Sequence, residues 1–230
     1  MQVLPLHPSV QTYFQCCGKT LCGGCDYQHQ MKNRGRATCA FCRTTLPESG
    51  EEKMARLRKR VALKDPDAMC TLAMHYGDGD FGRPVDQRKC IELLRQAACL
   101  DDPFAQFQLG VMLHTGAMGL VKDYEKARLH FEKAAEGGHV LARHNLACIE
   151  ASNDDDVAAM RHWRLSASAG HRSSMETLIE CFEEGFLRRK DLAETLQAMY
   201  LARAELKSDD RDTFIAYLKR AGEYRDEYEC

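Results

Sequence analysis

Six of the chain's 12 cysteines lie within 27 residues near the start of the sequence: Cys16, Cys17, Cys22, Cys25, Cys39 and Cys42. Zinc is bound by tetrahedral sets of four thiolate or imidazole ligands, which commonly come in pairs two residues apart. Cys22 and Cys25 have that spacing, as do Cys39 and Cys42, and interleaved glycines permit the tight turns that such pairs need. The spacing therefore predicts zinc ligands rather than a disulfide framework, which a reducing compartment disfavours.

Two other chemistries compete for the same segment. Gly18-Lys19-Thr20 matches the end of a phosphate-binding loop, but that motif requires a glycine where this chain has Tyr13, and no apolar strand precedes it. A redox Cys-x-x-Cys site needs a strand–loop–helix context that lowers the pKa of one thiol. The stretch before Cys22 is itself rich in cysteine, which favours a metal site over a redox site.

The pattern CCGKTLCGGC, followed by CAFCR, resembles the core of a RING-type zinc finger, a domain common to many ubiquitin ligases. In that family, ligand pairs one and three hold one zinc, and pairs two and four hold the other. The resemblance implies that Cys22 and Cys25 are the third pair. It implies that Cys17 belongs to the second pair and that Cys16 replaces the histidine that many RING domains place where this chain has Lys19. One zinc would then be bound by Cys16, Cys17, Cys39 and Cys42.

The first ligand pair of the RING pattern is missing, because residues 1–15 contain no cysteine. The opening stretch MQVLPLHP resembles the segment that normally follows that pair, as if the chain began just after it at an internal methionine. Cys22 and Cys25 therefore lack two partners. His7 and His29 are substitutes to be weighed against ordinary surface histidines. We expect one zinc, or two if the missing ligands are supplied upstream.

The RING resemblance also implies a partner and a mechanism. In that family a ubiquitin-conjugating enzyme docks on the two zinc loops and the helix between them. Arg43, directly after the last ligand, matches the cation that many RING domains use to hold the ubiquitin-charged enzyme. Ala40 stands where the family usually has proline. No catalytic residue is expected, because such ligases act by orienting the reactants of their partner.

The remainder of the chain is repetitive. From about residue 65 the sequence aligns with itself, with Ala68, Ala105 and Ala142 spaced 37 residues apart. The leucines that follow four positions later keep the same spacing, and a fourth leucine, Leu178, comes 32 residues after the third. Each unit reads as a helix, a glycine-containing turn and a second helix. A small and a large residue four apart share one helix face, so neighbouring hairpins must stack to bury it.

These units resemble the Sel-1-like repeat, a relative of the tetratricopeptide repeat. The second unit carries most of the pattern: Ala105, Leu109, Gly110, Gly116, Gly119, Asp123, Lys126, Ala127, Ala134, Ala135 and Gly138. The resemblance implies an α-solenoid of helical hairpins whose concave surface binds partner proteins without catalysis.

We therefore expect a mostly α-helical protein with a small RING-like zinc module followed by the solenoid. The predicted parts are a RING-type finger over residues 1–46, a linker helix over 47–64, about four repeats over 65–207 and a capping helix over 208–230.

Charge and hydropathy exclude some classes of function. Residues 1–64 carry 11 Lys and Arg against 4 Asp and Glu, a net charge of +7, while the rest carries 21 against 30, a net charge of −9. The excess of +7 is modest and no aromatic stacking pattern accompanies it, so no nucleic-acid partner is expected. No apolar run is long enough to span a membrane and no signal peptide is recognisable. The expected compartment is cytoplasmic or nuclear, and the run RLRKR suits a linker helix better than a nuclear signal.

Two functions remain. If the finger is intact, the chain is a RING-type ubiquitin ligase whose repeats bind the substrate. The alternative is a non-catalytic zinc-finger and repeat scaffold for protein–protein interaction, with a degenerate RING. A hydrolase or transferase is disfavoured, because His139 and His171 recur at equivalent repeat positions, which indicates repeat architecture rather than catalysis.

Overall fold

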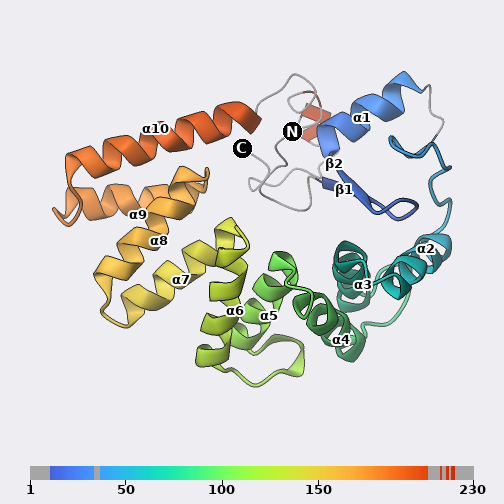
Figure 1. The fold of residues 1–230 in the computed structure, drawn as a ribbon, viewed down its shortest axis with the longest axis horizontal. Helices are drawn as coiled ribbons and strands as arrows, with labels where there is room; N and C mark the ends of the chain where they lie inside the picture. The colour runs from blue at the N-terminus through green and yellow to red at the C-terminus, as the bar shows by residue number, and fades with distance from the viewer. Residues whose placement is uncertain (1–10, 34–36, 207–212, 214–215, 218, 221–230) are drawn as a thin grey trace. The chain divides into compact units, whose positions relative to one another are not determined.

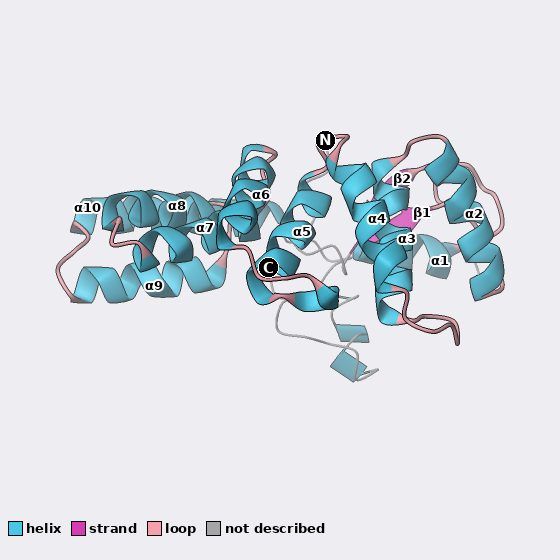
Figure 2. Cartoon of the chain, turned by 90° about the horizontal axis from the view of Figure 1, so that it is seen from below, coloured by secondary structure: helices cyan, strands magenta, loops and turns pink. Residues whose placement is uncertain are grey.

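The computed structural model describes residues 11–33, 37–206, 213, 216–217 and 219–220. The chain divides into two compact units, one of residues 1–71 with 204–230 and one of residues 72–203. Helices dominate the described residues, and the two short strands belong to the first unit (Figure 2). None of the described helices has the length and apolar character that crossing a membrane requires.

The first unit opens with an antiparallel hairpin of β1 (Gln11–Phe14) and β2 (Lys19–Cys22) (Figure 1). The turn is closed by the amide of Gly18, which donates to the carbonyl of Phe14 at 2.8 Å and has a φ of 68°. Glycine adopts that left-handed conformation without steric cost. Helix α1 (Gly23–Lys32) follows at once, and the Cys22 sulfur caps it by accepting a hydrogen bond from the amide of Cys25.

Helix α2 (Gly50–Ala62) lies within the range predicted for a linker helix. Ser49 caps its start, with the hydroxyl oxygen accepting from the amide of Glu52 at 3.1 Å. Met54 and Leu57, three residues apart, are its buried side chains. This spacing is that of an amphipathic helix with one apolar face.

Asp65 joins three elements of the first unit. Its Oδ2 accepts from the Tyr13 hydroxyl of β1 at 2.7 Å and from the Nε of Arg60 in α2 at 2.9 Å. Its Oδ1 accepts from the amide of Ala68 at 3.2 Å and so caps the following helix. Charged partners make these hydrogen bonds stronger than neutral ones. One carboxylate thus fastens the cysteine-rich hairpin to α2 and to the start of the first repeat.

The described residues from 66 to 206 form a succession of helical hairpins (Figure 1). The helices are α3 (Pro66–Asp78), α4 (Gln87–Ala98), α5 (Pro103–Thr115), α6 (Tyr124–Glu136), α7 (Val140–Ser152), α8 (Asp156–Ser168), α9 (Arg172–Glu183) and α10 (Arg189–Leu206), with a short 3-10 turn, η2 (Ala117–Gly119), between α5 and α6. The predicted fold class, mostly α-helical with a solenoid of hairpins and a small N-terminal module, is confirmed.

The repeated small and large residues form the core of the hairpins. Ala105 and Ala142 are fully buried, and Leu146 is 1% exposed. The close approach of α5 to α6 requires Gly110, because a Cβ there would lie 2.7 Å from the ring of Phe131. Small residues at these positions let the helices pack closely enough to exclude water.

The helix caps also recur. The first helix of each repeat is capped by a side chain at an equivalent position, Asp65, Asp102, His139 or His171, which accepts a hydrogen bond from the amide three residues later. In the third and fourth repeats a histidine ring nitrogen therefore accepts the capping hydrogen bond, where a carboxylate oxygen accepts it in the first two repeats. This physical role explains why the histidines recur.

The second helices of the first three repeats are capped in the same way, by Asp86, Asp123 and Asp155. The predicted capping helix over residues 208–230 lies almost entirely outside the described residues.

Candidate metal centre

Four of the six predicted ligands come together in the first unit. The sulfurs of Cys16, Cys17, Cys39 and Cys42 all lie within 4.8 Å of one another. Cys17 and Cys39 are separated by 3.7 Å between sulfurs, and Cys16 and Cys42 by 3.3 Å. This is the set that the RING resemblance assigns to the second and fourth ligand pairs.

Two tight turns present these four thiols. Cys16 and Cys17 lie in the turn between β1 and β2, whose ends are fixed by strand pairing. Cys39 and Cys42 lie in a second turn, closed by the Arg43 amide donating to the carbonyl of Cys39 at 3.1 Å. The edge-on contact of Phe14 with Phe41, at 5.7 Å between ring centroids, packs one turn against the other.

The thiols differ in burial and in acidity. Cys39 is fully buried and Cys42 is exposed. Burial, together with hydrogen bonds to neighbouring thiols, raises the pKa of Cys16 and of Cys17. Hydrogen bonds from the hydroxyl and the amide of Thr44 lower the pKa of Cys42 to about 6. Only a cation among the sulfurs would make four thiolates stable together, since like charges at this distance repel.

Cys22 and Cys25 are not part of this group. Cys22 is 1% exposed and acts as the cap of α1, where its sulfur lies 3.3 Å from the amide nitrogen of Cys25. Among the described residues, no third ligand candidate joins the pair. Both ring nitrogens of His29 lie near the side-chain amide of Asn33, at 3.2 and 3.0 Å, and His7 lies outside the described residues.

Arg43 and Lys19 lie beside the cluster without joining it. Arg43 is exposed and has a φ of 63°, a left-handed conformation that non-glycine residues seldom adopt. The ammonium of Lys19 lies over the ring of Phe41, 5.2 Å from its centroid. Lys19 therefore takes part in a cation–π contact at the position where the RING family often has a ligand.

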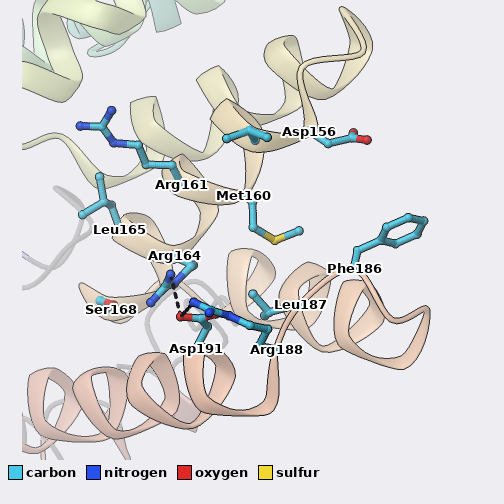
Figure 3. Close-up of a pocket in the computed structure, with 11 residues that line it drawn as sticks. Asp156, Met160, Arg161, Arg164, Leu165, Ser168, Phe186, Leu187, Arg188 and Asp191 are labelled. Atoms are coloured by element: carbon cyan, nitrogen blue, oxygen red, sulfur yellow. Dashed lines mark hydrogen bonds and ion pairs between the residues drawn. The ribbon is translucent and has the colours of Figure 1, made fainter.

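One feature of the second unit is not predicted from the sequence. A pocket of about 870 Å³ opens between α8 and the segment from Phe186 to Asp191 (Figure 3). The sequence contains one indication of this pocket. Arg188 occupies the helix-capping position that Asp86 and Asp123 occupy in the first two repeats.

Comparison with known proteins supports the repeat assignment. The family model described as Sel1 repeat matches residues 66–102, 103–139 and 149–171. A curated relative, chitin synthase regulatory factor 2 of Schizosaccharomyces pombe, is 30% identical over 127 residues. Those residues are 52% of this chain but only 25% of the relative, so the chain matches about a quarter of that protein's length.

Two solved structures have a similar fold. A Sel1 repeat protein from Oxalobacter formigenes is 26% identical with a TM-score of 0.52, covering 56% of this chain and 98% of that one. A protective antigen of uropathogenic Escherichia coli is 20% identical with a TM-score of 0.57, covering 80% of this chain and 40% of that one, and shows likeness of fold alone. The residues that the family model matches begin at 66, so the RING resemblance stays a prediction. What the comparisons show is that this chain carries Sel1 repeats over residues 66–102, 103–139 and 149–171.

Proposed function

We propose that this protein is a non-catalytic scaffold, in which the repeats bind a partner protein and a zinc ion organises the N-terminal module. The observation that supports it is the run of Sel1 repeats, whose stacked hairpins leave an extended surface of rigidly held side chains. Repeat proteins of this kind use such surfaces for binding. The histidines that would be the first candidates for catalysis in the repeats, His139 and His171, are helix caps.

The donor set fits zinc. With four thiolates at about 2.3 Å from a tetrahedral Zn²⁺, neighbouring sulfurs would be about 3.8 Å apart. The separation of 3.7 Å between Cys17 and Cys39 agrees with that value, and the 3.3 Å between Cys16 and Cys42 is shorter than it. The ion would supply the charge that keeps the buried sulfurs deprotonated. The four cysteines would link the two turns, which the contact between Phe14 and Phe41 also joins.

A RING-type ubiquitin ligase is the second candidate. The observation that favours it is the pairing of Cys16 and Cys17 with Cys39 and Cys42, which is the interleaved order that the family requires. The lone Cys22–Cys25 pair argues against it, because the family's docking surface is built from two zinc loops. A single metal-bound loop would present only part of that surface.

A reconstituted ubiquitin-transfer assay separates the two functions. We expect the purified chain, with activating enzyme, a panel of conjugating enzymes and ubiquitin, to add nothing to the background of the conjugating enzymes alone. Chain formation that Arg43→Ala or Cys39→Ser abolishes would instead establish the ligase.

The scaffold function has its own test. A partner recovered by cross-linking should attach within residues 66–203 and should remain bound after zinc chelation, because the repeats contain no part of the cysteine cluster. Cross-links confined to the cysteine module, or binding that chelation abolishes, would contradict the proposal.

A further inference from the structure

The four cysteines of the candidate metal centre differ in how easily a molecule from solvent can reach them. Cys42 is exposed, Cys16 and Cys17 are partly buried, and Cys39 is fully buried. The sulfur of Cys39 also accepts a hydrogen bond from the amide of Phe41 at 3.4 Å, which holds this sulfur inside its turn. A reagent that enters from solvent would therefore meet the Cys42 sulfur first.

The Cys42 sulfur lies close to a thiol of the other turn. The Cys16 sulfur is 3.3 Å away from it, which is shorter than the 3.7 Å between the sulfurs of Cys17 and Cys39. A disulfide bond joins two sulfurs at about 2.05 Å, so the Cys16 and Cys42 sulfurs would have to approach by only about 1 Å to form one.

The backbone holds the two cysteine turns in place by contacts that do not involve a metal. The first turn is closed by the amide of Gly18, which donates to the carbonyl of Phe14 at 2.8 Å. The second is closed by the amide of Cys39, which donates to the carbonyl of Thr44 at 2.8 Å. The rings of Phe14 and Phe41 pack one turn against the other. The thiols of the two turns should therefore stay within reach of each other when a metal ion leaves.

We propose that Cys42 and Cys16 form a peroxide-sensitive pair, whose oxidation to a disulfide releases the zinc ion. The inference rests on the proposed zinc site and names how that site is regulated. Zinc holds its cysteine ligands as thiolates, which are the nucleophilic form of cysteine. The disulfide would leave Cys17 and Cys39 as the remaining ligands, and two thiolates cannot close the tetrahedral set of four.

The oxidation takes place in two steps. The Cys42 thiolate attacks one oxygen of hydrogen peroxide, so that a sulfur–oxygen bond forms, the oxygen–oxygen bond breaks and hydroxide leaves. The Cys16 thiolate then attacks the sulfur of this sulfenic acid, so that the disulfide forms and a second hydroxide leaves. Two electrons pass from the two sulfurs to the peroxide, and the hydroxides take up protons to form water. A thiol reductant reverses the change by thiol–disulfide exchange.

The test is a hydrogen peroxide titration of the zinc-loaded full chain. A zinc-binding dye measures the release of the ion, and peptide mapping by tandem mass spectrometry identifies the disulfide. We expect the release of one zinc per chain together with a Cys16–Cys42 disulfide, and dithiothreitol should restore zinc binding. Release without that disulfide, or retention of zinc while the exposed thiol of Cys99 is oxidised, would overturn the inference.

A variant separates the attacked thiol from the resolving thiol. In Cys16→Ser the sulfenic acid on Cys42 has lost its partner, so labelling of Cys42 by dimedone should rise severalfold over that of the metal-free wild-type chain. Equal labelling of Cys42 in both would contradict the role of Cys16. The control is Cys99→Ser, because Cys99 is also an exposed cysteine but lies at the end of α4 in the repeats. This variant should release zinc as the wild type does.

The same measurements distinguish this inference from the proposed zinc site. If the purified chain binds no zinc, the zinc site itself fails, and mapping of the peroxide-treated metal-free chain still tests the Cys16–Cys42 pair. Zinc that stays bound under peroxide would leave the zinc site standing and remove only its regulation.

Discussion

Phe131 in the second repeat is 1% exposed and packs among alanines of α6 and α7, whereas the cysteine module places four thiols around a common centre. The repeat gains its stability from apolar surface removed from water and from helix caps that recur in every unit. The module has a two-stranded hairpin, which is only marginally stable alone. A zinc chelator should therefore affect the cysteine module and leave the repeats unchanged. A mutation in the apolar core should destabilise the repeats and leave zinc binding unchanged.

The largest expected effect is on the metal. Cys39→Ser should reduce bound zinc from one ion per chain to none, because the remaining three thiolates cannot close the tetrahedron. Elemental analysis of the purified chain measures this directly. Cys25→Ser is the matched control and should keep one zinc, since Cys25 lies outside the cluster. Two zinc ions in the wild type would show that Cys22 and Cys25 bind metal as well.

A mutation in the apolar core should lower the stability of the repeats and leave zinc binding unchanged. Phe131→Ala removes a buried ring and leaves a cavity, which typically costs about 3–5 kcal/mol of unfolding free energy. Denaturant unfolding monitored by circular dichroism measures the loss, while bound zinc should stay at one per chain. Leu129→Ala on the same helix is the control, because Leu129 is 57% exposed and should change the stability little. A similar loss in both variants would contradict the assigned core.

The histidine cap predicts a pH dependence of the fourth repeat. Burial, and secondarily the neighbouring His144, lowers the pKa of His171 from 6.5 to about 4. The unfolded chain therefore binds a proton more readily, so the stabilisation is complete above pH 6.5 and is lost progressively as the pH falls toward 4. Stability measured across that range should fall less steeply in His171→Asn, which keeps an uncharged acceptor. An unchanged slope would show that the titration of His171 does not control it.

The smallest expected change in stability comes from removing the helix cap Asp102. Asp102 accepts from the amide of Ala105 at 2.7 Å, and Asp102→Ala should lower the unfolding free energy by about 1 kcal/mol. Asp102→Asn keeps an acceptor and should cost clearly less. Thermal unfolding of the two variants side by side checks the difference, and equal losses would mean that the cap contributes through charge alone.

Much of the repeat region was predictable because its signal is periodic. The spacing of Ala68, Ala105 and Ala142 predicts the buried faces. The recurrence of His139 and His171 indicates repeat architecture, and their capping hydrogen bonds explain it. Periodic spacing is enough to predict the buried faces of the repeats, because each helix makes the same kind of contacts with the next one.

The cysteine cluster and the pocket depend instead on contacts between side chains that are far apart in the sequence. The assembly of the four thiols followed from the family resemblance, because spacing alone left Cys22 and Cys25 equally eligible. The pocket was not predicted, since it needs α8 and the start of α10 together. Only the exchange of aspartate for Arg188 at a repeated position marked it in the sequence.

The central claim is that zinc organises the cysteine module while the repeats fold without it. Hydrogen exchange measured by mass spectrometry, with and without a zinc chelator, tests this most directly. We predict that amides of residues 11–45 lose protection on chelation while those of residues 87–168 keep theirs. Unchanged protection in the cysteine module, or loss of protection in both regions, would contradict the account.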